Sequence, residues 1–264
     1  MLKNYKELLN LDATIAKELF ESCSHPWDVL PLIKEFIFKL IPTLGEEYEE
    51  MDENVYVHKE AKVAKSACIQ GPTIICKGAE IRHCAYIRGS VIVGENSVIG
   101  NSTEVKNSII FNNCQCPHYN YVGDSVLGEY AHTGAGVILS NVKSDKKNVK
   151  IKVDDEVIET GLRKFGAIIG DHVEVGCNSV ICPGTIIYPD TNIYPLTRVR
   201  GVIGPKKIVK DDAVSYKYGM GIKQKKTKGF GNAIVYTFKK TGSIFKQMFI
   251  TVKSLFTGGV KVSQ

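Results

Sequence analysis

Apolar residues recur at every sixth position over a long stretch of the chain. The series has ten members with none missing: Val57, Val63, Ile69, Ile75, Ile81, Ile87, Val93, Ile99, Val105 and Phe111. A second series, four places on from each member, is nearly all small or β-branched and runs from Ala61 to Gln115. A period of six fits neither an amphipathic helix nor an alternating strand. It is the signature of a parallel β-helix, in which three short strands close one triangular coil.

Two breaks interrupt the hexads. The first inserts Pro117-His118-Tyr119-Asn120, after which the register resumes at Tyr121, Leu127, Thr133 and Leu139. The second covers 143–166, a polar segment whose Val149–Val153 part alternates like a strand and predicts a projecting loop or hairpin. The hexads return from Ile169 to Val199, which gives about seven coils in all. Insertions in a solenoid form loops and often line the binding face, so the breaks are where we look for chemistry.

The two ends of the chain differ from the repeat. Residues 1–52 carry helical apolar spacing and predict a helical cap over the open end of the first coil, in front of a β-helix at 53–210. Residues 211–264 predict a basic linker and an amphipathic helix. No acidic residue follows Asp212 while ten lysines do, so the last 52 residues carry +10 and the rest −4.

The basic tail allows two interpretations. Its apolar face packs on the solenoid as a second cap, or it lies on an anionic membrane surface with its lysines toward the headgroups. We favour the cap, and we do not expect nucleic-acid binding, because the tail has no arginines.

Compartment and metal content follow from what is missing. There is no apolar run of ~20 residues and no signal-peptide core, so we expect a cytoplasmic protein with reduced cysteines. Cys114 and Cys116 lack a second pair at zinc-finger spacing, so we predict no metal site.

Several residues near the first break have side chains suited to group transfer. His118 stands in the break, where a side chain can leave the repeat, and histidine is the usual general base near neutral pH. Arg88 and Lys106 are 18 residues, or one coil, apart, and should stack on one face as a cationic phosphate site. The tight Gly134-Ala135-Gly136 turn offers backbone N–H groups to an oxyanion.

The segments around His118 and Asn141 resemble a known family. His118-Tyr119-Asn120-Tyr121-Val122-Gly123-Asp124, Gly134-Ala135-Gly136-Val137 and Ser140-Asn141 are similar to the acetyltransferase domain of bifunctional N-acetylglucosamine-1-phosphate uridyltransferase / glucosamine-1-phosphate acetyltransferases. The segment from Gly161 to Asp171 is similar to the archaeal-type sugar-phosphate nucleotidyltransferases that share this domain. The resemblance covers roughly residues 85–205 and implies a left-handed β-helix assembled as a homotrimer.

The resemblance also implies roles for individual residues. His118 falls on the catalytic base, Tyr121 and Asn141 fall on sugar contacts, and Arg88 with Lys106 falls on the pair that holds the sugar phosphate. Ala135 matches a backbone contact to acetyl-CoA. The chain departs from the family where His132 replaces a sugar-binding asparagine and Cys177 replaces a serine facing acetyl-CoA. In the longer loop, Lys147 and Lys164 compete for the role of one further lysine.

The activity implied is acetyl-CoA-dependent N-acetylation of an amino-sugar phosphate such as glucosamine-1-phosphate. We expect no nucleotidyl transfer, because no glycine-rich phosphate loop precedes the solenoid. The alternatives are a trimeric scaffold without catalysis and, on the same type of coil, a zinc-dependent carbonic anhydrase. A carbonic anhydrase of this type needs three zinc-binding histidines, and here Gly123 stands in the region where the third is expected.

Overall fold

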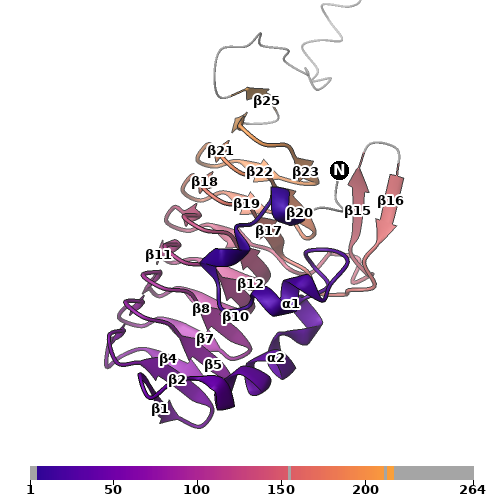
Figure 1. Ribbon diagram of the computed structural model, residues 1–264. Helices are drawn as coiled ribbons and strands as arrows, with labels where there is room; N and C mark the ends of the chain where they lie inside the picture. Colours follow the sequence, from indigo (N-terminus) through magenta and orange to yellow (C-terminus); the bar gives the residue numbers. More distant parts are fainter. Residues whose placement is uncertain (1–4, 154–155, 211–212, 217–264) are drawn as a thin grey trace, which may run out of the picture. The chain divides into compact units, whose positions relative to one another are not determined.

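The hexad region forms a left-handed parallel β-helix of about eight turns (Figure 1). The computed structural model describes residues 5–153, 156–210 and 213–216. About seven turns were predicted, and the added turn contains β23 and β24, which follow the last predicted hexad at Val199. The parallel β-helix inferred from the spacing and the left-handed coil implied by the resemblance are both confirmed.

The coils present three faces. Face I consists of β4 (Cys68–Gln70), β7 (Tyr86–Arg88), the first half of β10 (Glu104–Ile110), the first half of β12 (Tyr121–Leu127), β14 (Ile138–Leu139), β19 (Val180–Ile181) and β22 (Arg198–Val199). Face II consists of β2 (Val55–His58), β5 (Thr73–Ile75), β8 (Val91–Val93), the second halves of β10 and β12, β17 (Ala167–Ile169), β20 (Thr185–Ile187) and β23 (Val202–Ile203). Face III consists of β3 (Lys62–Val63), β6 (Glu80–Ile81), β9 (Val98–Asn101), β11 (Gln115–His118), β13 (His132–Thr133), β18 (Glu174–Val175), β21 (Asn192–Ile193) and β24 (Lys207–Lys210).

An antiparallel strand pairs with each end of the solenoid. β1 (Tyr48–Asp52) pairs with β2 in the first coil, and β25 (Ala213–Tyr216) pairs with β24 in the last coil. Each therefore covers part of a sheet edge that would otherwise offer unpaired backbone groups to another chain.

The hexad register needs two corrections in the middle of the solenoid. Ile110, not Phe111, pairs with Val93, and Val122, not Tyr121, pairs with Val105. The cause is that β10 and β12 continue round the corner between faces I and II through a single left-handed residue each, at φ 45° and 47°. The coil from Val105 to Val122 is therefore 17 residues long rather than 18.

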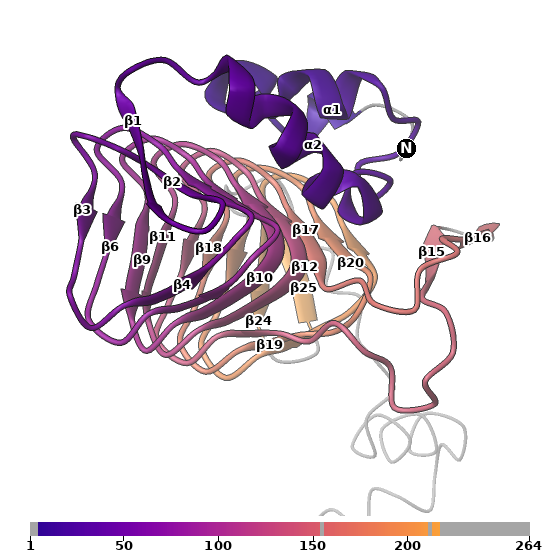
Figure 2. The same cartoon turned by 90° about the horizontal axis from the view of Figure 1, so that it is seen from below.

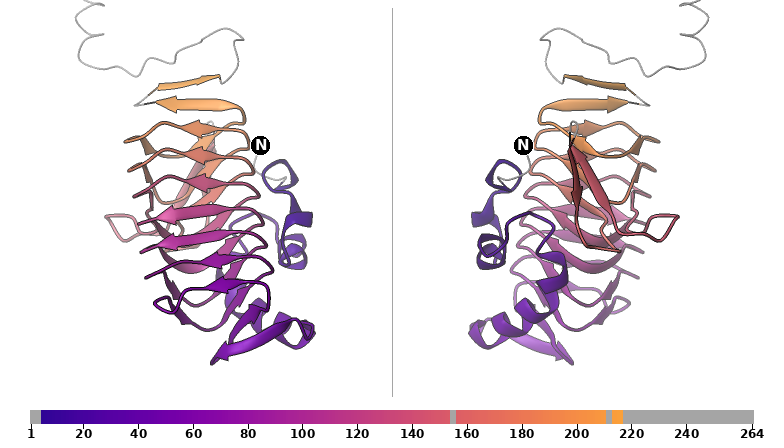
Figure 3. Two further views of the ribbon diagram at one scale, coloured as in Figure 1. Left: turned by 90° about the vertical axis from the view of Figure 1, so that its left-hand side faces the viewer. Right: turned by 90° about the vertical axis from the view of Figure 1, so that its right-hand side faces the viewer.

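The N-terminal helices lie along face II and do not cap the first coil (Figures 2 and 3). Helix α2 (Ile33–Leu40) contacts β8 and β10. The remaining helical elements are α1 (Lys17–Glu21) and the 3-10 turns η1 (Tyr5–Glu7), η2 (Leu11–Ala13), η3 (Leu30–Leu32) and η4 (Ile41–Thr43).

A second apolar row explains this placement. On face II the outward-facing residue of most strands is also aliphatic, and none of these side chains is exposed: Ile74, Ile92, Ile109, Val126, Ile168 and Ile186. Such a row in water would favour aggregation, so it requires a cover. Phe20 packs edge-on against Phe111 at 5.5 Å between ring centroids, and Trp27 lies 6.1 Å from Phe165.

The second break is the predicted hairpin. β15 (Lys150–Val153) and β16 (Glu156–Glu159) pair antiparallel and project from the corner between faces I and II (Figure 2). All eight cysteines lie in the described part and form no disulfide. Among the described residues, no helix is long and apolar enough to span a membrane. The predicted basic linker and amphipathic helix lie, from residue 217 on, outside the described residues.

Candidate functional site

Arg88 and Lys106 lie side by side on face I, as their spacing predicts. β7 and β10 pair with Glu104 beside Tyr86 and Val105 beside Ile87, so Lys106 follows one coil after Arg88 in the same outward row. Arg88 is exposed and donates to Glu104 Oε1 at 2.8 Å, a bond that holds the pKa of the guanidinium above its ordinary value. Lys106 is half-buried, and its ammonium lies 3.4 Å from Asp124 Oδ2.

Tyr121 and Asn141 meet above Gly123. The side-chain amide of Asn141 donates to the Tyr121 hydroxyl at 3.1 Å, although the two residues are 20 apart in sequence. A Cβ atom at Gly123 would lie 2.6 Å from that hydroxyl and 2.9 Å from the amide nitrogen, so only glycine leaves room for the pair. Burial, followed by the Asp124 carboxylate, raises the pKa of Tyr121, which keeps the hydroxyl protonated at neutral pH.

Asp124 connects these two groups. Its Oδ2 accepts from Lys106 and from Asn141, and its Oδ1 accepts from Asn107 Nδ2 at 2.9 Å. Only 4 % of the residue is exposed, and a buried carboxylate needs such donors to remain charged. The sequence places Asp124 at a corner, which is where it lies, but spacing alone does not reveal the three side-chain donors.

His118 ends β11 and turns outward at the first break. The corner is fixed by buried Asn120, whose Oδ1 accepts from the His118 N–H at 3.3 Å and whose Nδ2 donates to the Gly134 carbonyl at 2.7 Å. The imidazole is exposed and makes no hydrogen bond to any of the described residues. The inserted tetrapeptide is therefore a rigid corner that presents a free ring to solvent.

Ala135 and Cys177 continue the column that begins at His118. The His118 carbonyl accepts from Gly136 N–H at 3.0 Å, and the Ala135 carbonyl accepts from Asn178 N–H at 2.8 Å, so the three residues occupy one corner in successive coils. The backbone N–H of Ala135 makes no hydrogen bond within the described part of the chain. A donor is thus open to a ligand one coil away from the imidazole.

Three predicted residues lie apart from this group. His132 lies on face III, where its Nδ1 is 2.7 Å from Glu174 Oε2, whereas Tyr121 belongs to face I and Asn141 follows β14 of that face. Lys164 is exposed at the base of the hairpin, where it bridges to Val142, and Lys147 is exposed in the same loop.

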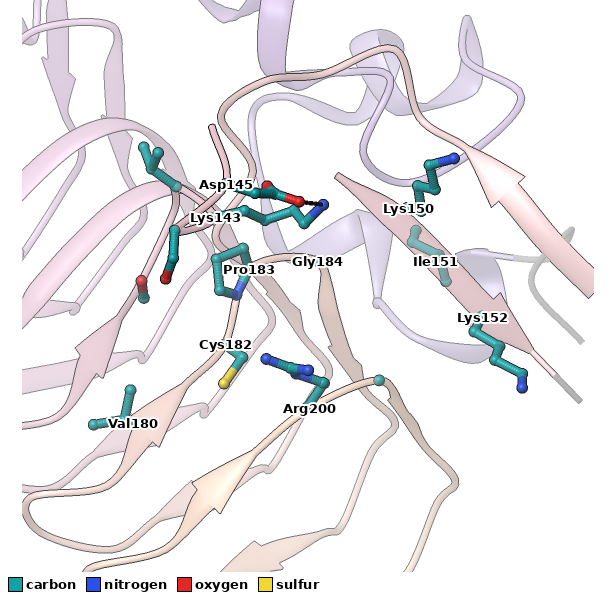
Figure 4. A pocket seen from close by; sticks show the side chains of 14 residues that line it. Lys143, Asp145, Lys150, Ile151, Lys152, Val180, Cys182, Pro183, Gly184 and Arg200 are labelled. Carbon is teal, nitrogen blue, oxygen red and sulfur yellow. Dashed lines mark hydrogen bonds and ion pairs between the residues drawn. The ribbon is translucent and has the colours of Figure 1, made fainter. Parts of the chain in front are cut away.

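A hollow of about 540 Å³ lies beside the hairpin rather than at His118 (Figure 4). Lys143, Asp145 and Arg200 are among its lining residues, and Lys143 is paired with Asp145 at 3.1 Å. Lys150 and Lys152 also belong to the lining, but Figure 4 shows their side chains directed away from Cys182 and Pro183, and Lys150 pairs with Glu159. Most of the positive charge is therefore neutralised or turned outward, and the hollow alone does not define an anion site. No group of three or more His, Cys, Asp or Glu residues suited to a metal ion occurs among the described residues.

The chain is similar to proteins that include a sugar-1-phosphate nucleotidylyltransferase/acetyltransferase. A family model described as GMPPB C-terminal domain matches residues 51–158. The bifunctional protein GlmU of Methanococcus maripaludis is 35% identical over 186 residues, covering 69% of this chain and 45% of that protein. The bifunctional sugar-1-phosphate nucleotidylyltransferase/acetyltransferase of Sulfurisphaera tokodaii is 37% identical over 165 residues, covering 60% and 41%.

Among solved structures, the N-acyltransferase AntD of Bacillus cereus, in complex with dTDP and coenzyme A, matches with a TM-score of 0.37 and 14% identity, covering 73% of this chain and 97% of that one. The chain spans less than half the length of these two bifunctional relatives. Over its solenoid, this chain resembles the left-handed β-helical acetyltransferase domain of the bifunctional sugar-1-phosphate nucleotidylyltransferase/acetyltransferases, as its hexads and the segments around His118 and Asn141 predict.

Proposed function

We propose that the chain transfers the acetyl group of acetyl-CoA to the amine of an amino-sugar phosphate such as glucosamine-1-phosphate, with His118 as the general base. The observation that carries the proposal is the setting of His118. Its exposed imidazole makes no hydrogen bond to the described residues. Tyr121 of the Tyr121–Asn141 pair follows three residues later, and the open N–H of Ala135 lies one coil away.

Each step of acetyl transfer has a group suited to it. The neutral imidazole takes a proton from the amine as the nitrogen attacks the thioester carbonyl, so that a C–N bond forms and the C–S bond breaks. The carbonyl oxygen gains negative charge during the attack, and the N–H of Ala135 is a preorganised donor for it. Coenzyme A leaves as its thiolate, and the His118 imidazolium can return the proton that converts it to the thiol.

The sugar phosphate is assigned to face I. Arg88 and Lys106 supply two cations in adjacent coils, and the guanidinium fork suits phosphate oxygens. Arg88 now donates to Glu104, a contact that an incoming phosphate would compete for. Tyr121 and Asn141 are hydrogen-bonding groups for sugar hydroxyls. The name of the Sulfurisphaera tokodaii relative supports a sugar phosphate as the substrate and acetyl transfer as the reaction.

The direct test is thiol release from acetyl-CoA with a panel of amines. Glucosamine-1-phosphate and galactosamine-1-phosphate should each be compared with unphosphorylated glucosamine and with N-acetylglucosamine-1-phosphate, which has no free amine. We expect release that requires both the amine and the phosphate. Absence of release with every amine, together with absence of acetyl-CoA binding, would favour the non-catalytic scaffold.

A further inference from the structure

Asp171 and Asp124, two carboxylates at corners of the solenoid, differ in the groups that donate hydrogen bonds to them. Asp171 accepts only from backbone N–H groups, those of Asn10 and Glu129, each at 2.7 Å. Asp124 accepts only from side chains, and two of its three donors, Lys106 and Asn141, belong to the proposed sugar site. The first carboxylate ties two backbone segments together, whereas the second contacts groups that face the substrate.

The corner itself does not require a carboxylate at position 124. The demand there is a left-handed backbone, with φ 47°. The same corner in the two preceding coils is filled by Asn107 at φ 45° and by Gly89 at φ 81°, stacked through the Asn107 N–H bond to the Gly89 carbonyl at 3.1 Å. Neither residue is charged, so backbone geometry does not explain why a buried charge stands here.

The carboxylate does determine how the Asn141 amide is oriented. An ionised carboxylate only accepts hydrogen bonds, so the nitrogen of the amide has to face Asp124. One of its N–H groups goes to Asp124 Oδ2 and the other to the Tyr121 hydroxyl. Two groups are then left for a ligand: the amide oxygen of Asn141 as an acceptor and the O–H of Tyr121 as a donor.

We infer that Asp124 is a positioning residue for the sugar: it fixes Asn141 with its oxygen toward the substrate, leaves Tyr121 as a hydrogen-bond donor, and holds the Lys106 ammonium in the same row. This inference rests on the proposed function. The ligand class is a polyhydroxylated ring bearing an anionic group, since the site then offers one acceptor, one donor and a cation.

The test compares Asp124→Asn with Asp171→Asn in the full chain. An amide at 124 donates as well as accepts, so it no longer dictates the orientation of Asn141. We expect Asp124→Asn to raise the Kd for glucosamine-1-phosphate by at least about tenfold, the cost of one misoriented hydrogen-bonding pair. The Kd for acetyl-CoA should not change. Asp171→Asn should leave both constants unchanged, whatever it does to thermal stability.

The folded protein decides between positioning and general damage. A loss of sugar-phosphate affinity in Asp124→Asn without a change in the Kd for acetyl-CoA supports the inference. A folded Asp124→Asn protein that binds the sugar phosphate as tightly as the parent overturns it.

A ligand-free readout separates this inference from the proposed function. The Tyr121 hydroxyl can be titrated by ¹³C-tyrosine NMR, with Tyr121→Phe identifying its signal. Removing the neighbouring carboxylate should lower the pKa of Tyr121 in Asp124→Asn but not in Asp171→Asn. If the parent neither binds nor acetylates amino-sugar phosphates while this pattern holds, the proposed function fails and the positioning network stands. If the Tyr121 pKa is unchanged in Asp124→Asn, the network is wrong.

Discussion

At the residue scale, the chemistry depends on a few side chains that leave the repeat. His118 is exposed because Asn120 anchors the corner behind it, and Tyr121 meets Asn141 because position 123 has no side chain. His118, Tyr121 and Asn141 are the side chains proposed to act on the ligand, whereas Asn120 and Gly123 position them. Single substitutions should therefore separate chemistry from scaffold.

Replacing His118 with alanine should remove the general base. We expect kcat for acetyl transfer to fall by ~10²–10⁴, with the Kd for acetyl-CoA and the melting temperature unchanged, because the exposed ring makes no hydrogen bond, ion pair or ring contact with the described residues. His172→Ala is the matched control, since His172 is also exposed at a corner but stacks on Tyr130, with 5.0 Å between ring centroids. A His118→Ala enzyme as fast as the parent would remove this residue from the mechanism.

Asp171 should make the free energy of unfolding depend on pH in the mildly acidic range. Burial raises its pKa from the ordinary 3.8 to about 6, so the folded state binds the proton more tightly than the unfolded state. Stability from this group is therefore fully present below about pH 4 and is lost as the pH rises through about 6. In Asp171→Asn that dependence should vanish. Melting temperatures of both proteins between pH 4 and 7 measure it, and a constant difference across that range contradicts the assignment.

The sequence accounts for part of this site and not for the rest. Spacing alone brings Arg88 beside Lys106, because 18 residues make one coil in that part of the solenoid. It does not reveal the contacts of Asp124, because the next coil has 17 residues and Asn141 lies just before the insertion at 143–166. For His132, spacing does not say which face of the coil carries it, and the structure pairs it with Glu174 on face III.

At the element scale, the apolar periodicity contained a signal beyond the hexads. The inward row predicts the coils, whereas the extra aliphatic residue preceding it in most strands of face II predicts a cover. The prediction of a cap over the end of the solenoid is wrong, because the pattern of the N-terminal helices specifies an apolar face but not its partner. The row from Ile74 to Ile186 supplies that partner.

The contribution of the N-terminal helices' packing on face II to the free energy of unfolding can be measured by truncating one buried aromatic side chain. Trp27 is 1% exposed, so Trp27→Ala should lower the free energy of unfolding by about 3–5 kcal/mol. Phe38, in α2 but 42% exposed, is the control, and Phe38→Ala should cost about 0.5 kcal/mol or less. Equal losses in urea unfolding would mean that the helices do not use face II as their core.

At the scale of the whole molecule, the described residues leave face I open along most of its length. Tyr86, Ile138 and Val180 are each 36–39% exposed there, in the same outward row as Tyr121. The proposed substrate groups therefore lie on a surface that the described residues of one chain do not enclose. A second copy of the chain would cover it, as the resemblance to trimeric acetyltransferases implies.

We accordingly predict a homotrimer, to be tested by sedimentation equilibrium. The mass should be three times that of the 29.2 kDa chain at micromolar concentration. Ile138→Glu should weaken assembly by placing a charge on face I, whereas Val157→Glu on the hairpin should leave it intact. A stable monomer for the parent protein would contradict the prediction.

The helical segment along face II also changes how the solenoid should come apart. Stacked coils ordinarily touch only their neighbours, so terminal coils are able to fray independently. Here Asn10 bonds to the coil of Asp171, the Ala13 carbonyl accepts from Asn112, and the Leu30 carbonyl accepts from Asn107. One segment thus joins the coil of β10 to the coil of β17, which are not neighbours because β12 lies between them. Amide exchange in the coils it spans should therefore proceed through a common opening rather than a gradient from the ends, and deleting the segment should restore that gradient.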